Sequence, residues 1–233
     1  MITIIIPAHK EKQNLTLLLS SLKTYEGYDT AEIFVALSPQ SENKYIEFEN
    51  RNIHFITCAK KGRAAQMNEA AKLANGNILV FLHADVKPPC SFLTDIRSTI
   101  SQNYDAGFFS YKFDKESPLL KINASFTSKD GIFTGGGDQC LFIKKDIFNV
   151  LKGFNEEQLV MEDFEFFRRM KENKVSYTIV KKDLVVSARK YESNSYLRVN
   201  LSNLLLVILF KMGYSSRKLK SLHDKLIRTP YNG

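Results

Sequence analysis

Short apolar runs alternate with stretches of helically spaced apolar positions through the first half of the chain. The runs predict strands, and the stretches between them predict helices. The expected strands lie near residues 2–6, 31–36, 52–56 and 77–82, and the expected helices near 11–24, 42–49 and 62–74. Strands separated by amphipathic helices form βαβ units, so we expect an α/β fold with a mostly parallel central sheet and helices on both faces.

The carboxyl ends of these strands are the expected ligand site, because open parallel sheets bind ligands along that edge. Residues 7–12, 38–41 and 83–85 follow three of the expected strands. We therefore look for binding and catalytic side chains first in these three segments.

The second half of the chain has a different pattern. A helix near 161–173 is surrounded by strand-like segments near 105–113, 139–144 and 175–180. This arrangement predicts a mixed or antiparallel extension of the same sheet.

The last fifth of the chain is both apolar and basic. A predicted helix over 197–212 contains an apolar run from Leu204 to Phe210, far shorter than the ~20 residues that span a bilayer. Residues 187–233 have a net charge of +7, nearly all of the +8 of the whole chain.

The length of 233 residues suits one sizeable domain. We expect this domain over 1–190, followed by a basic helical extension over 191–233. Packing of the extension on the domain or on a second subunit explains its apolar run without an added partner and is favoured. A peripheral contact with a membrane surface stays open.

Cysteine is sparse and unpatterned. The three cysteines are odd in number and have no C-x-x-C spacing, so neither a disulfide framework nor a zinc site is indicated. We expect a cytoplasmic protein, with any peripheral contact at the inner face of the membrane, and no nucleic-acid partner.

His83 and Asp85 are candidate metal ligands at the end of the fourth expected strand. Residues two apart share a face of extended chain, so both side chains would reach one ligand. A divalent cation that binds a diphosphate needs only one or two protein ligands, and an imidazole ligand favours Mn²⁺ over Mg²⁺. The alternative is that Asp85 caps a turn and His83 is an ordinary loop residue.

Arg63 lies at the start of an alanine-rich helix, after Lys60, Lys61 and Gly62. A basic cluster at a helix N-terminus suits a phosphate or diphosphate, because its charge adds to the helix dipole. A solvated basic corner would have the same sequence.

Glu162 and Asp163 fall in the first turn of the helix expected near 161–173. The helix dipole favours acids there whatever the function. The functional interpretation is that one of them, preferably Asp163, is a general base that accepts a proton from an acceptor hydroxyl.

Two further segments are candidates for substrate contacts. Gly135–Gln139 precedes an apolar segment and is either a hairpin bend or a loop that approaches substrate closely. Arg189 follows the last strand-like segment, and its planar donor fork suits a diphosphate, although it is equally consistent with surface charge.

In this order, the segments resemble family 2 glycosyltransferases of the GT-A fold, and most of all the small bacterial branch associated with radical-SAM and selenoprotein-domain proteins. The matching segments are residues 2–15, 61–89, 135–148, 152–154, 161–171 and 187–192. The resemblance implies a GT-A nucleotide-diphospho-sugar transferase that moves a sugar, with inversion, from a nucleoside-diphosphate sugar to an acceptor hydroxyl. It also implies a divalent cation, Mn²⁺ or Mg²⁺.

Residue roles follow from the same resemblance. Asp85 matches the metal-binding acid that ends the DxD-type motif, with His83 in place of its first acid, and Asp163, beside Glu162, matches the catalytic base. The implied substrate contacts are Pro7, Ala8, His9 and Glu11 at the base and ribose, Arg63 and Arg189 at the diphosphate, and Asp138 and Gln139 on the acceptor side. The chain departs from the family at His83 and in the segment 33–41, which lacks the usual base-binding Asp.

Two other functions stay open at this stage. A GT-A-like nucleotidyltransferase also uses a strand-end carboxylate and a metal, but it usually has a glycine-rich loop after the first strand, and residues 7–11 contain no glycine. A non-catalytic nucleotide or membrane-surface binding protein would explain the missing acid. The acceptor, including a lipid-linked one, and a homodimer or membrane contact through the C-terminal helices also stay open.

Overall fold

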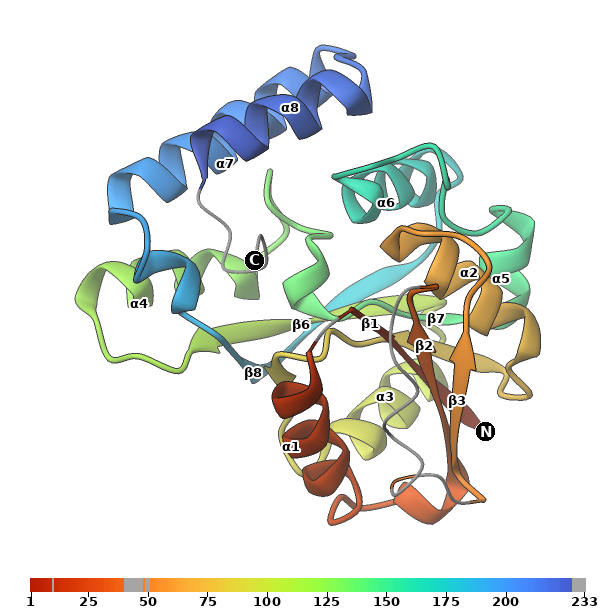
Figure 1. Cartoon of the computed structure of the whole chain (residues 1–233). Helices are drawn as coiled ribbons and strands as arrows, with labels where there is room; N and C mark the ends of the chain where they lie inside the picture. The colour runs from red at the N-terminus through yellow and green to blue at the C-terminus, as the bar shows by residue number, and fades with distance from the viewer. Residues whose placement is uncertain (10, 40–47, 49–50, 228–233) are drawn as a thin grey trace.

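One eight-stranded sheet forms the centre of the protein (Figure 1). The structure is a computed structural model that describes residues 1–9, 11–39, 48 and 51–227. The strands lie side by side in the order β3-β2-β1-β4-β7-β6-β8-β5. Their bounds are β1 Ile2–Ala8, β2 Ala31–Leu37, β3 Ile53–Thr57, β4 Ile78–Phe81, β5 Val86–Lys87, β6 Ala106–Phe113, β7 Phe142–Lys144 and β8 Tyr177–Val186.

The first four strands, β1 to β4, are parallel, as the βαβ pattern predicts. Ile2 of β1 lies opposite Ala31 of β2 and Ile78 of β4, and β3 pairs in parallel with β2. The chain continues from β1 to β2 and β3 on one side of β1, and then crosses to β4 on the other side of β1. The strand order therefore reverses at β1. A ligand crevice is expected at the carboxyl end of the sheet there.

Helices cover both faces of the sheet, which explains why its first strands are apolar on both sides. On one face, leucines of α1 (Lys12–Leu22) and Phe92 of α3 (Phe92–Ser101) pack against β1 and β2. On the other face, α2 (Arg63–Leu73), α5 (Lys145–Val150) and α6 (Glu162–Glu172) share a second core. The predicted α/β fold with a mostly parallel sheet is confirmed.

The predicted mixed extension is also confirmed, with changed boundaries. β7 is antiparallel to both β4 and β6, whereas β6 and β8 are parallel. β7 begins only at Phe142, because Gly137–Gln139 form a short 3-10 turn and Cys140 has a positive φ of 51°. β8 continues six residues beyond the predicted end at 180, to Val186. The predicted helix near 42–49 lies outside the described residues, apart from Phe48.

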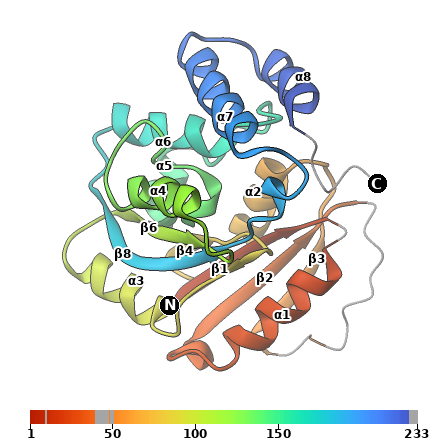
Figure 2. The same cartoon turned by 90° about the vertical axis from the view of Figure 1, so that its left-hand side faces the viewer.

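Two C-terminal helices form the outermost layer on one side of the molecule (Figures 1 and 2). α7 (Tyr196–Lys211) and α8 (Ser216–Leu226) pack on each other and, through Leu206, Phe210 and Leu219, on the residues that begin α6. α4 (Pro118–Ser125) contacts α7 through a hydrogen bond from Asn123 to Asn200 of 2.8 Å. Within the described part of the chain, no helix combines the length and apolar character needed to cross a bilayer.

Candidate active site

The carboxyl ends of β1 and β2 are held together by Gln66 of α2. Its buried Nε2 donates to the carbonyl oxygens of Ala8 at 3.1 Å and Ala36 at 2.6 Å. Pro7 and Ala8, two of the predicted nucleotide contacts, have buried side chains and shape this strand end rather than face solvent. His9 is exposed just beyond it, and its Nδ1 lies 2.7 Å from the Ser38 hydroxyl after β2.

His83 and Asp85 occupy a turn and not a continuation of β4. The strand ends at Phe81, and the amide of Val86 donates to the His83 carbonyl oxygen at 3.2 Å. The shared face expected for extended chain is therefore lost, and the two side chains have different partners. His83 Nδ1 lies 3.8 Å from Asp138 Oδ1, whereas Asp85 Oδ2 lies 3.1 Å from Arg189 Nη2.

Arg189 joins two carboxylates from distant parts of the chain. Its Nη2 lies 3.1 Å from Asp85 and 3.4 Å from Glu11, which precedes α1. The two acids thus converge on one positive group. No cluster of three His, Cys, Asp or Glu side chains suited to a metal occurs among the described residues. A divalent cation here would need further ligands, which phosphate oxygens and water supply for Mg²⁺ and Mn²⁺.

The start of α6 is tied to the start of α2 by an ion pair. Met161 has a positive φ of 64°, which turns the chain abruptly into the helix. Glu162 then points inward, with 3% of its side chain exposed, and its Oε1 lies 2.7 Å from Nε of the half-exposed Arg63. This nearby carboxylate raises the pKa of Arg63, so the guanidinium stays charged. Glu162, predicted as a catalytic candidate, is placed as the partner that fixes Arg63.

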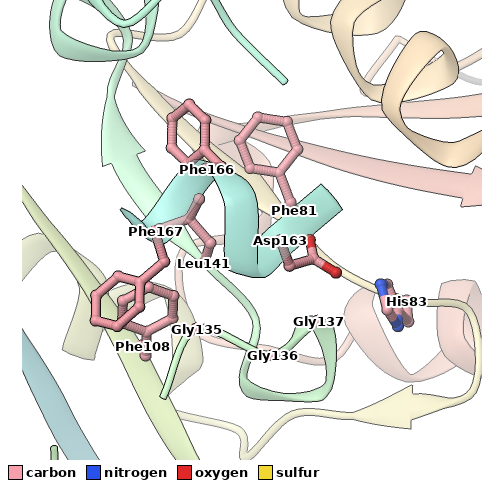
Figure 3. A pocket seen from close by; sticks show the side chains of 10 residues that line it. All are labelled: Phe81, His83, Phe108, Gly135, Gly136, Gly137, Leu141, Asp163, Phe166 and Phe167. Carbon is pink, nitrogen blue, oxygen red and sulfur yellow. The ribbon is translucent and has the colours of Figure 1, made fainter. Parts of the chain in front are cut away.

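Asp163 faces the strand-end turn. Its carboxylate points toward the His83 ring, with Gly137 beside both groups (Figure 3). A Cβ atom added to Gly137 would lie 2.4 Å from His83 Cε1 and 2.6 Å from Asp163 Oδ2, so all three groups are nearly in contact. Phenylalanines of β4, β6 and α6 close the far side, leaving a cavity of about 10 Å³, room for about one water molecule.

Burial and neighbouring charge both act on Asp163. Burial, and then repulsion from Glu162, raise the pKa of Asp163 to about 6, although Arg63 and His83 oppose the rise. Burial alone would lower the pKa of His83, but its contact with Asp138 and the charges of Asp163 and Asp138 raise it. Asp163 therefore titrates near neutral pH, the range in which a carboxylate is effective as a general base.

The loop before β7 presents one acid to the site and buries the next residue. Asp138 is exposed beside His83; partial burial would raise its pKa, but the contact with His83 lowers it. Gln139 is buried: its Oε1 accepts from the Gly135 amide at 3.0 Å, and its Nε2 donates to the Thr127 carbonyl at 3.1 Å. Gln139, predicted as an acceptor contact, instead holds this loop in shape.

Several residues that shape the site were given no individual role in the sequence analysis. Lys190 is close enough to be influenced by Asp138 and Arg63, and burial lowers its pKa. Arg169 donates to the buried Glu165 and to the Gly153 carbonyl, which anchors α6 to the preceding loop. Gly137 had a signal in the glycine run, but only the fold shows that His83 and Asp163 approach it.

Comparisons with solved structures agree with this architecture. S. aureus TarS 1-349 in complex with UDP-GlcNAc matches with a TM-score of 0.65 and 17% identity, over 97% of this chain and 71% of that one. The mannosyltransferase PcManGT from Pyrobaculum calidifontis, in complex with GDP-Man and Mn²⁺, has the same TM-score and identity, over 97% of this chain and 68% of that one. The catalytic domain of Drosophila beta1,4galactosyltransferase 7, complexed with xylobiose, matches at a TM-score of 0.51 and 13% identity, over 76% of this chain and 63% of that one.

A search of curated proteins gave no match. The family model for glycosyl transferase family 2, in contrast, matches residues 3–159, more than half of the chain. That range includes the carboxyl ends of β1 and β2 and the turn with His83 and Asp85. The chain therefore belongs to glycosyl transferase family 2 and is a glycosyltransferase with a GT-A-like α/β fold.

Proposed function

We propose that the protein transfers a sugar, with inversion, from a nucleoside-diphosphate sugar to an acceptor hydroxyl, with Asp163 as the general base. One observation carries the proposal: the Asp163 carboxylate, with a pKa of about 6, faces the turn at the end of β4, where a GT-A-like sheet binds its ligand. The proposed diphosphate contacts are Arg63, paired with Glu162, and Arg189, paired with Asp85 and Glu11. The order of the matching segments further supports the small bacterial branch associated with radical-SAM and selenoprotein-domain proteins.

In this reaction the acceptor oxygen forms a bond to the anomeric carbon while the bond from that carbon to the diphosphate oxygen breaks. The hydroxyl proton passes to Asp163, and the electron pair of the broken bond leaves with the nucleoside diphosphate. Arg63, held in place by Glu162 at 2.7 Å, and the N-terminus of α2 stabilise the departing negative charge.

A divalent cation fits the acids at Asp85 and Glu11. Both carboxylates converge on the Arg189 guanidinium, and oxygen ligands of this kind suit Mg²⁺ or Mn²⁺. A bound cation would neutralise charge on the diphosphate. His83 faces Asp138 and Asp163, so its proposed part in the site is to contact substrate and to hold these acids, while Asp85 remains the main metal ligand.

A donor screen tests the proposed function. The purified chain is incubated with UDP-, GDP- and dTDP-sugars, with and without Mn²⁺, and release of nucleoside diphosphate is measured together with binding by calorimetry. We expect one donor class to be hydrolysed or transferred. Binding without turnover would favour a nucleotide-binding module. A parallel incubation contains a nucleoside triphosphate and a sugar phosphate, and release of pyrophosphate there would favour a nucleotidyltransferase.

Replacing Asp85 with Asn tests the proposed cation site. The substitution removes one of the two carboxylates that meet at Arg189, so stimulation by Mn²⁺ is expected to fall at least about tenfold, a conservative figure for weakening a cation worth several kcal/mol. The measurement is the donor-turnover rate as a function of Mn²⁺ concentration. Asp146→Asn, an exposed acid in the first turn of α5, is the matched control. An unchanged Mn²⁺ response in Asp85→Asn contradicts the assignment.

A further inference from the structure

α7 is apolar on two opposite sides. One side, with Val199, Leu206, Val207 and Phe210, is buried against the rest of the protein. On the opposite side, five large apolar side chains recur at helical spacing and are 39–68% exposed. They are Leu197, Leu201, Leu205, Ile208 and Met212, which we call the outer α7 face.

A helix that is apolar all round is normally enclosed by other apolar groups. From Leu197 to Met212, the outer α7 face spans sixteen residues of the chain, a length of about 22 Å at 1.5 Å per residue. α4, which contacts α7 through Asn123, also has exposed apolar side chains: Leu119, Ile122 and, just after the helix, Phe126. The five side chains of the outer α7 face alone exceed the isolated exposed apolar residues that soluble proteins usually show.

The α7–α8 hairpin, which includes this face, has an excess of positive charge. In the described part of 191–227, the acids Glu192 and Asp224 are each ion-paired, with Lys115 at 2.5 Å and Lys220 at 2.6 Å. Among the described residues, Lys211, Arg217, Lys218 and Lys225 have no carboxylate within salt-bridge distance. The excess positive charge of the α7–α8 hairpin is therefore unneutralised and exposed.

We propose that the outer α7 face docks on an anionic lipid surface, with α7 lying in the interface and the cations of α8 contacting lipid headgroups. Apolar side chains flanked by lysine and arginine are what such an interface binds. A second copy of this chain fits less well, because a two-fold dimer through this face would bring together two α7–α8 hairpins that both have excess positive charge. The docking does not depend on the proposed reaction, since none of these side chains belongs to the site.

Docking would place the Glu162–Asp163 turn of the candidate active site close to the lipid surface. The inner side of α7 and α8 packs on Val160, Met161 and Phe164, the residues on either side of the Glu162–Asp163 turn. An acceptor hydroxyl on a membrane-bound molecule is then the class that this geometry favours, a consequence that does rest on the proposed function.

Co-sedimentation of the full chain with vesicles tests the docking. Vesicles of phosphatidylcholine alone are compared with vesicles containing about 30% phosphatidylglycerol, at low and high salt. We expect binding to the anionic vesicles that weakens with salt, and a loss of at least about tenfold in the triple variant Leu201→Asn, Leu205→Asn, Ile208→Asn. Arg217→Gln with Lys218→Gln is expected to reduce the preference for anionic lipid.

The control replaces three exposed apolar side chains elsewhere, which are at least as exposed as those replaced in α7: Leu17→Asn, Leu73→Asn and Val150→Asn. Thermal unfolding shows whether each variant folds, and donor turnover in solution is expected to stay unchanged in both. Equal binding by the α7 variant and the control, or no preference for anionic vesicles, would overturn the proposal. So would light scattering that shows a wild-type dimer and a monomeric α7 variant, because the face would then bind a second copy.

Discussion

Asp163→Asn is expected to lower kcat by about 10²- to 10⁴-fold while leaving donor binding nearly intact, because it removes proton acceptance without changing the size of the side chain. In the proposed function, donor affinity depends mainly on Arg63 and Arg189, whose ion pairs with Glu162, Asp85 and Glu11 do not involve Asp163. Turnover and calorimetric donor binding are measured on the same preparation. A variant that keeps wild-type kcat would show that another group accepts the proton.

The pH profile of the wild-type protein supplies a second readout of the same residue. Since a general base must be ionised, kcat/KM is expected to fall below about pH 6, the pKa of Asp163. Arg63 opposes the rise in this pKa, so Arg63→Met is expected to move the acidic limb to higher pH. An acidic limb below pH 5 in both proteins would argue against Asp163 as the base.

Stability is expected to change in the opposite direction to activity. An Asp with a folded pKa of about 6 and an unfolded pKa of about 3.9 destabilises the fold above pH 6, because its charge costs more in the native state. The penalty disappears as pH falls from 6 to 4. Asp163→Asn should therefore gain about 1 kcal/mol at pH 8, reduced from the full shift because the side chain is partly exposed, and nothing at pH 4. Denaturant unfolding of Asp163→Asn and the Asp146→Asn control at both pH values measures this difference.

The fold was predictable where burial imposes a simple periodicity. β1 and β2 are buried along their whole length, and their continuous apolar runs matched the observed strands to within two residues. α3, α4 and α5 were not predicted. α4 is short, with only Leu120 buried, and α5 has only Phe148, so neither has an apolar stripe long enough to stand out.

The sequence predicted most of the residues that form the site, but not which of them contact one another. The sequence brought Asp163, Arg63, Asp85 and Arg189 into one hypothesis, but it paired His83 with Asp85. That pairing assumed an extended chain. Because the chain turns after Phe81, His83 lies beside Asp138, and Asp85 pairs with Arg189. Contacts between residues about 55 to 180 positions apart depend on how strands and helices pack, and no local pattern records them.

Gly137→Ala is expected to lower kcat by at least about 10²-fold, because catalysis is sensitive to displacements of about 1 Å. The added Cβ would lie 2.4 Å from His83 and 2.6 Å from Asp163, so the loop or both side chains must move. Gly136→Ala is the matched control, since its Cβ would approach no atom closer than the Phe164 ring at 3.6 Å. Turnover and thermal unfolding are measured for both variants. Equal activity in the two would mean that the close packing of His83, Gly137 and Asp163 is not required for the reaction, and that the base acts from another position.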